Sequence, residues 1–169
     1  FYGTDSFNQD LSYWDTSNVL TMRSMFIRAV QFNQPIGSWD VSNTQDMSSM
    51  FWGASTFNQD ISTWDVSSVT NMSEMFYGSK ISCELNNWNV SKVTSMERMF
   101  QNTTIFNKDI SNWDVSNVTS MGYMFTNSAI FNQDLSSWEV ANVLNCTEFF
   151  RLANSWTLPK PNFTNCNPD

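Results

Sequence analysis

The chain has no histidine, and it is poor in basic residues. Its 169 residues include 8 Lys and Arg against 16 Asp and Glu, which gives a net charge of −8. Without histidine the chain lacks the commonest general base and the commonest metal ligand of proteins. A phosphate backbone is bound by clustered cations, so nucleic acid is not an expected partner. These absences argue against an enzyme and against a nucleic-acid-binding protein.

Long hydrophobic runs are absent as well. No apolar run approaches the roughly 18 residues that a membrane-spanning helix needs, and the first residues do not follow the pattern of a signal peptide. Hydrophobic residues nevertheless make up 41% of the chain and aromatic residues 15%. That is enough apolar material for a core and too much for a disordered chain. We therefore expect a folded chain with no membrane span in these residues.

What the sequence does contain is a repeat of about 25 residues. Successive tryptophans of the repeat are 25, 25, 24, 25 and 25 residues apart, and they are Trp14, Trp39, Trp64, Trp88, Trp113 and Trp138. All ten methionines fall in two columns of the repeat, in pairs that are each followed at once by phenylalanine. We expect these methionine and phenylalanine columns to fill the core. Self-similarity at a fixed period is typical of stacked-repeat architectures.

The repeats suggest where the chain is divided. We expect residues 1–150 to form six stacked repeats and residues 151–169 to form a C-terminal cap, because the prolines of Leu158–Pro161 leave the pattern and would end strand pairing. Phe1-Tyr2-Gly3 matches Phe76-Tyr77-Gly78. The chain thus begins in the middle of a repeat, and we interpret it as a fragment of a longer protein.

The spacing of apolar residues within one repeat predicts its local structure. Trp39 and Val41 are two residues apart, so in a strand both would point inward and Asp40 outward. The later Met-x-x-Met-Phe stretch places apolar residues at i, i+3 and i+4, which indicates a helical turn. The predicted fold is a leucine-rich-repeat-like right-handed solenoid with one parallel β-sheet face, short helical turns on the other face and a C-terminal cap.

The unit Phe-Asn-Gln-Asp-Ile-Ser-x-Trp-Asp-Val-Ser-x-Val-Thr-x-Met-x-x-Met-Phe resembles the repeat of BspA-like leucine-rich-repeat surface proteins. The resemblance covers residues 1 to about 150. Members of that family are cell-surface or secreted proteins of bacteria, protists and algae, implicated in adhesion or without an assigned function. The resemblance implies a leucine-rich-repeat fold and an extracellular or cell-surface location. The fourth repeat departs from the pattern, since Ile81-Ser82-Cys83-Glu84 replaces Phe-Asn-Gln-Asp and one residue is missing.

Stacking would align the position between Trp and Val into an outward row, which we call the carboxylate row. Carboxylates in neighbouring coils would lie about 4.8 Å apart. Like charges at that distance repel, so another group must compensate them. In one interpretation the row recruits cations such as Ca²⁺ or a basic partner surface, and flanking hydroxyls and amides bind a glycan. In the other, each Asp accepts hydrogen bonds from its own turn. The members of the row are Asp15, Asp40, Asp65, Asn89, Asp114 and Glu139.

A second polar column follows the first phenylalanine of the repeat. It contains Asn8, Asn33, Asn58, Asn107 and Asn132. We interpret it as a stacked amide ladder that satisfies the backbone of the turns. No metal site and no organic cofactor are assigned from the sequence.

The three cysteines divide into a predicted pair and a single residue. Cys146 occupies a methionine slot of the last repeat, and Cys166 lies in the tail that must fold over that end. A disulfide between them would close a loop of about 20 residues and stabilise the fold by roughly 3 kcal/mol. It would also fit an oxidising compartment. Cys83 is either buried or bonded to another chain.

Six glycosylation sequons occur, and they are Asn71, Asn89, Asn102, Asn117, Asn145 and Asn162. Among them Asn102 is the preferred candidate, since it lies in the connection after Met-Phe, where loops face solvent.

Two functions remain open at this point. The first is a non-enzymatic extracellular surface module for adhesion, which binds proteins or glycans through its sheet face. The second is a structural subunit of an extracellular filament or multi-protein assembly, in contact with copies of itself or with partners through exposed aromatic residues such as Tyr13, Trp52, Tyr77 and Tyr123.

Overall fold

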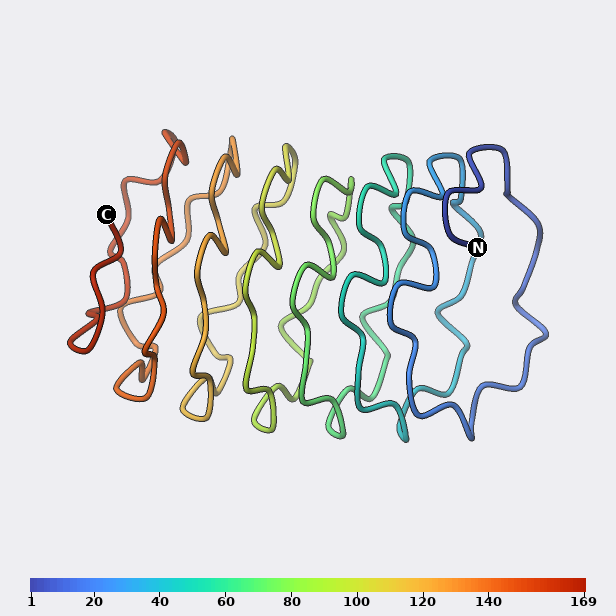
Figure 1. The fold of residues 1–169 in the computed structure, drawn as a ribbon, viewed down its shortest axis with the longest axis horizontal. Helices are drawn as coiled ribbons and strands as arrows, with labels where there is room; N and C mark the ends of the chain where they lie inside the picture. Colours follow the sequence, from blue (N-terminus) through green and yellow to red (C-terminus); the bar gives the residue numbers. More distant parts are fainter.

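The computed structural model describes residues 1–169 as a stack of coils, one for each repeat, with the two termini towards opposite ends of the stack (Figure 1). It contains no helix and no extended strand. The only β-type pairing is a series of isolated parallel bridges, which runs from Thr21 to Asp46, Asn71, Ser95, Ser120 and Asn145. A helix long and apolar enough to cross a membrane is not present.

The tryptophan side of the coil is built from tight turns. Trp64 and Val66 are 3% and 1% exposed while Asp65 between them is exposed, so the side-chain directions agree with the prediction. The backbone does not agree with the prediction of a strand, because the N–H of Trp64 bonds to the Ile61 carbonyl at 3.2 Å within a turn. A second turn follows, from the Val69 N–H to the Val66 carbonyl at 2.9 Å. The predicted parallel β-sheet face is therefore absent.

The methionine side is not helical. We call residues 22–28, 47–53, 72–78, 96–102 and 121–127 the turn ladder, because turns and bonds between coils alternate in it. The Met75 N–H bonds to the Met72 carbonyl at 3.2 Å, closing one turn. Alternate N–H groups donate to the next coil: Met72 to Ser95, Glu74 to Glu97, Phe76 to Met99 and Gly78 to Gln101. In an α-helix these groups would bond four residues back in the same coil.

Two columns of the turn ladder, which continue to Gly3 at one end and to Glu148 and Leu152 at the other, have positive φ angles. Ten residues other than glycine adopt this left-handed conformation, and Gly3, Gly53 and Gly78 share one of the columns. Glu74 has φ of 60° and Gly78 of 63°. A left-handed residue at the third position of each turn reverses the chain and aims the next free N–H along the stack axis. The fold-class prediction of a leucine-rich-repeat solenoid is therefore wrong, since the structure has neither its sheet nor its helical turns.

A short local motif recurs at the rim of the coils. In Asx-apolar-Ser, the Asx side chain accepts the N–H of the serine, and the apolar residue between them points inward. The coil of Trp64 has three such turns, with N–H···O distances of 2.9, 3.0 and 3.0 Å. Their central residues, Ile61, Val66 and Met72, are at most 1% exposed. This arrangement places a polar rim around an apolar interior in every coil.

Aromatic columns run through the core along the stack. Neighbouring rings are nearly parallel, as in Phe51 and Phe76 with centroids 5.9 Å apart and planes 2° apart. At the C-terminal end the rings turn edge-on, with Phe125 and Phe149 at 81° and Phe131 and Trp156 at 85°. The tail also contacts the preceding coil, since Trp156 Nε1 donates to the Gln133 carbonyl at 2.8 Å.

Candidate functional site

The carboxylate row lies on the outer surface, and its aspartates are held by their own turns. Oδ1 of Asp40 accepts the Ser42 N–H at 3.0 Å and the Ser42 hydroxyl at 2.6 Å. Asp114 makes the same pair of bonds to Ser116 at 3.1 and 2.6 Å. In each case Oδ2 has no partner within the chain and faces solvent.

These hydrogen bonds keep the row ionised. The pKa of Asp15, Asp40, Asp65 and Asp114 is lowered, first by the hydroxyl and then by the N–H of the serine two residues on. Neighbouring charges oppose this, since Asp15 raises the pKa of Asp40, and Asp40 raises that of Asp65. The turn bonds have the larger effect, so the aspartates carry full charge at neutral pH.

Two members of the row differ from the aspartates. Asn89 accepts the same bonds from Ser91, at 3.2 Å to the N–H and 2.7 Å to the hydroxyl, without a charge. Glu139 is exposed and is followed two residues later by Ala141, so it has no serine to bind. The row is therefore negative at both ends with a neutral amide in between.

A second acidic row was missed in the sequence. Asp10, Asp60, Asp109 and Asp134 precede their serines by two residues and form the same turns, with lowered pKa values for the same causes. The signal was available, because Asx-apolar-Ser occurs twice within eight residues in the third and fifth repeats. Pro35 and Glu84 stand at the corresponding positions of the other two repeats.

The hydroxyls and amides that were assigned to a glycan are engaged within the chain. Ser42 and Ser116 donate to their aspartates. The neighbouring column donates to the previous coil, as when Asn112 Nδ2 bonds to the Asn86 carbonyl at 2.7 Å and the Ser137 hydroxyl bonds to the Ser111 carbonyl at 3.0 Å. The bonds of Asn112 and Ser137 join coils, whereas Asn87 of the same column is exposed and makes no hydrogen bond within the chain.

The amide column forms a ladder along the stack. Asn33 Oδ1 accepts the Asn58 N–H at 2.9 Å, and Asn107 Oδ1 accepts the Asn132 N–H at 2.8 Å. In the irregular fourth repeat Ser82 takes the place of asparagine and bonds to Asn58 Oδ1 through its N–H and its hydroxyl, both at 2.9 Å.

A depression of about 320 Å³ opens beside this break in the ladder. Among the residues that line it are Asn58, Asp60, Ser82, Glu84 and Lys108. The Lys108 ammonium binds Glu84 Oε1 at 2.7 Å. This is the one hollow of the surface that has the size of a small ligand, and it occurs where the repeat is irregular.

Cys83 forms one wall of the depression. It is half-buried and unpaired, and it packs against the core. Burial raises the pKa of its thiol, so the sulfur is protonated at neutral pH and is not a ready nucleophile.

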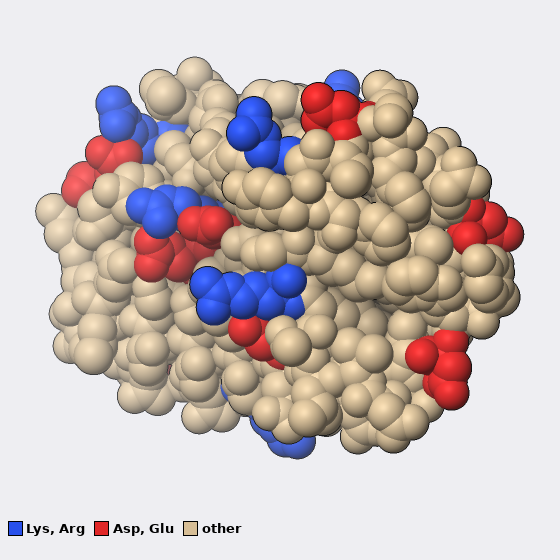
Figure 2. Space-filling view, turned by 45° about the vertical axis from the view of Figure 1, so that its right-hand side comes forward, with Lys and Arg blue, Asp and Glu red and all other residues tan.

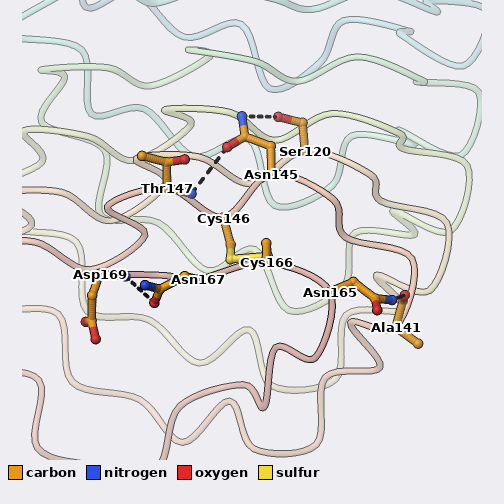
Figure 3. Close-up of a disulfide and its surroundings, with 9 residues drawn as sticks. All are labelled: Ser120, Ala141, Asn145, Cys146, Thr147, Asn165, Cys166, Asn167 and Asp169. Atoms are coloured by element: carbon orange, nitrogen blue, oxygen red, sulfur yellow. Dashed lines mark hydrogen bonds between the residues drawn. A yellow bond between two sulfur atoms is a disulfide. The ribbon is translucent and has the colours of Figure 1, made fainter.

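The other two cysteines are joined. The Cys146–Cys166 disulfide connects the last coil to the tail, and Asn165 Nδ2 binds the Ala141 carbonyl beside it at 2.6 Å (Figure 3). Three sequon asparagines, Asn89, Asn117 and Asn162, are exposed, and the other three are half-buried. Asn102 is one of the half-buried three, and its Oδ1 accepts Asn127 Nδ2 at 2.8 Å.

Charge is sparse on the surface. Figure 2, in which the N-terminal end is turned forward, shows small groups of Lys and Arg beside Asp and Glu, separated by wide uncharged areas. Arg98 belongs to one group, with Glu97 at 2.7 Å and Glu74 at 3.8 Å. No three His, Cys, Asp or Glu side chains converge into a group that would hold a metal ion.

The fold defines a protein of stacked coils with polar rims. A family model described as "Mycoplasma protein of unknown function, DUF285" matches residues 1–82 and 79–167. The two matches together cover most of the chain, so the chain belongs to the DUF285 family. The resemblance to BspA-like leucine-rich-repeat proteins was therefore a wrong identification. No curated protein and no solved structure matches the chain.

Proposed function

We propose that this chain is a non-enzymatic, extracellular or cell-surface module that binds a basic protein surface through the carboxylate row. The observation that carries the proposal is the state of the aspartates. Each has one oxygen fixed by its own turn and the other free. The row therefore presents ordered, ionised acceptors that need no rearrangement before they meet a cation.

A protein partner fits this surface better than a glycan does. A glycan needs both donors and acceptors, and four of the five donors in the neighbouring column are engaged between coils. A basic protein surface supplies cations and needs acceptors only. The disulfide supports an extracellular location, since such bonds persist in oxidising compartments.

Binding to a poly-L-lysine surface tests the proposal. The variant D40N/D65N/D114N should keep the fold, because Asn89 already forms the same turn with an amide. We expect about a 10-fold weaker interaction at low salt and a shallower salt dependence, from the loss of three exposed ion pairs.

The matched control is D10N/D109N/D134N, which changes the net charge equally in the second acidic row. We expect it to bind more tightly than the first variant. Equal losses of affinity in both variants would show that net charge alone holds the cation. A wild-type chain that binds a glycan array but does not bind poly-L-lysine would overturn the proposal. Removal of the protein from intact cells by an added protease is the expected result for a surface location.

A further inference from the structure

We propose that the depression beside Cys83 binds the guanidinium group of an arginine side chain from the partner protein. The inference deepens the proposed function and rests on it for the class of partner, but it concerns a different set of residues. Its basis is a comparison between repeats of the same chain.

Two repeats show how a glutamine can cover this position, while Gln34 of the second repeat makes no such bond. Gln59 Nε2 donates to the carbonyl of Asn33 at 2.8 Å and to its Oδ1 at 3.0 Å. Gln133 Nε2 does the same on Asn107, at 3.1 and 2.9 Å. An amide N–H from the next coil therefore lies on the backbone carbonyl of the ladder asparagine.

The fourth repeat has no such amide. Cys83 stands where the other two repeats have Gln59 and Gln133, and its side chain carries no N–H and is two heavy atoms shorter. Asn58 Oδ1 is satisfied by Ser82. The Asn58 carbonyl accepts no hydrogen bond from within the chain, and Asn58 is one of the residues that line the depression.

The charges around this carbonyl favour a cation. Asp60 and Glu84 both line the depression, and Lys108 neutralises only one of them through its bond to Glu84 Oε1. One negative charge is left without a partner. Asp60 Oδ1 is held by Ser62 at 2.9 Å, so Asp60 Oδ2, Glu84 Oε2 and the Asn58 carbonyl remain as free acceptors.

A guanidinium group matches three acceptors better than an ammonium does. It is planar, carries five N–H donors and binds several oxygens at once, whereas an ammonium acts as a point charge. It would place an N–H where Gln59 and Gln133 place theirs in the regular repeats, and it would balance the remaining charge.

The depression also lies at a distinctive place along the sequence. The two matches to the DUF285 model overlap at residues 79–82, and the depression lies at this junction. The irregular repeat occurs once in the stack, so the depression beside it fixes where along the regular row the partner binds.

The test is an NMR titration of the whole chain with Nα-acetyl-arginine N-methylamide. We expect saturable shifts of the Ser82 and Glu84 amide signals. Cys83→Gln should lower the affinity at least 10-fold, because its amide would occupy the Asn58 carbonyl. Cys83→Ser is the control, since it removes the thiol and leaves the depression open, and it should bind like the wild type.

Three results would overturn the inference: shifts that do not saturate, equal affinity of the Cys83→Gln variant, or equal affinity for Nα-acetyl-lysine N-methylamide. The outcome is separable from the proposed function. D40N/D65N/D114N should still bind the arginine probe, and Cys83→Gln should still bind poly-L-lysine. If D40N/D65N/D114N lost poly-L-lysine binding and the wild type did not bind the arginine probe, only the arginine site in the depression would be ruled out.

Discussion

The indole N–H of Trp113 donates a 3.0 Å hydrogen bond to the carbonyl oxygen of Leu85 in the preceding coil. Trp39, Trp64, Trp88 and Trp138 make the same contact one coil apart, at 2.9 to 3.1 Å. The tryptophan column therefore fills the core and also gives a carbonyl of each preceding coil a second donor, beside the N–H of that coil's own turn.

Trp113→Phe tests this second role. The ring volume is largely kept, while the Leu85 carbonyl loses one of its two donors and keeps the Trp88 N–H at 3.1 Å. We therefore expect the free energy of unfolding to fall by about 1 kcal/mol. Trp14→Phe is the control, because Trp14 is 39% exposed and its indole has no acceptor. This variant should lose about 0.5 kcal/mol of unfolding free energy. Urea unfolding measures both, and equal losses would show that the hydrogen bond is not important.

The left-handed columns of the turn ladder yield a paired prediction. Gly78 has φ of 63° and an added Cβ would meet nothing within 4 Å. Gly78→Ala should therefore cost about 1 kcal/mol from backbone strain alone. Leu152 has φ of 60° in the same column and is 55% exposed, so Leu152→Gly should raise stability by about 0.5 kcal/mol or more. Urea unfolding measures both variants. If Gly78→Ala and Leu152→Gly changed the free energy of unfolding in the same direction, this account of the columns would be contradicted.

The aspartate turns predict how stability depends on pH. Their pKa values are lowered in the folded state from the ordinary value of 3.8, so they stabilise the fold fully above that value. The contribution is lost as the pH falls through the lowered values. The chain has no histidine that titrates between about pH 5 and 8. We expect a melting temperature that is level in that window and falls below about pH 4.

D40N/D65N/D114N is the control for the pH dependence. Amides keep the turns without titrating, so the decline in melting temperature below the ordinary aspartate pKa should be shallower than in the wild type. An identical decline in both proteins would assign the acid sensitivity to other carboxylates.

Reduction of the Cys146–Cys166 disulfide should loosen the C-terminal end. The bond spans 20 residues, and its loss should cost roughly 3 kcal/mol. Hydrogen exchange should rise at Phe149 and in the tail, while the turn ladder of the first coils keeps its protection. A uniform rise along the stack would instead show that the tail supports every coil. Half-buried Cys83 should not replace either partner, because it lies in the fourth repeat.

The amino-acid pattern predicted side-chain direction better than backbone shape. The i, i+2 spacing of Trp64 and Val66 and the i, i+3, i+4 spacing of Met72, Met75 and Phe76 each identified buried residues. The predicted strand and helical turn were wrong, because tight turns produce the same inward spacing. Distinguishing them requires knowing where the N–H groups donate, and that is decided by the next coil.

The depression shows the same limit. The sequence identified the irregular fourth repeat, with Cys83 in place of glutamine and one residue missing. It did not reveal that glutamine reaches back to cover an asparagine carbonyl 26 residues earlier, so it did not predict an open acceptor between two acidic residues.

The sequence by itself determined the period of the repeat, the inward residues of each coil and the cysteine of the last coil, Cys146, that joins the tail. These follow from local spacing and from which side chains avoid water. Only the tertiary structure decided the left-handed columns of the turn ladder and the depression beside Cys83. Each of these depends on hydrogen bonds between coils, and such bonds join residues that are about 25 positions apart in the chain.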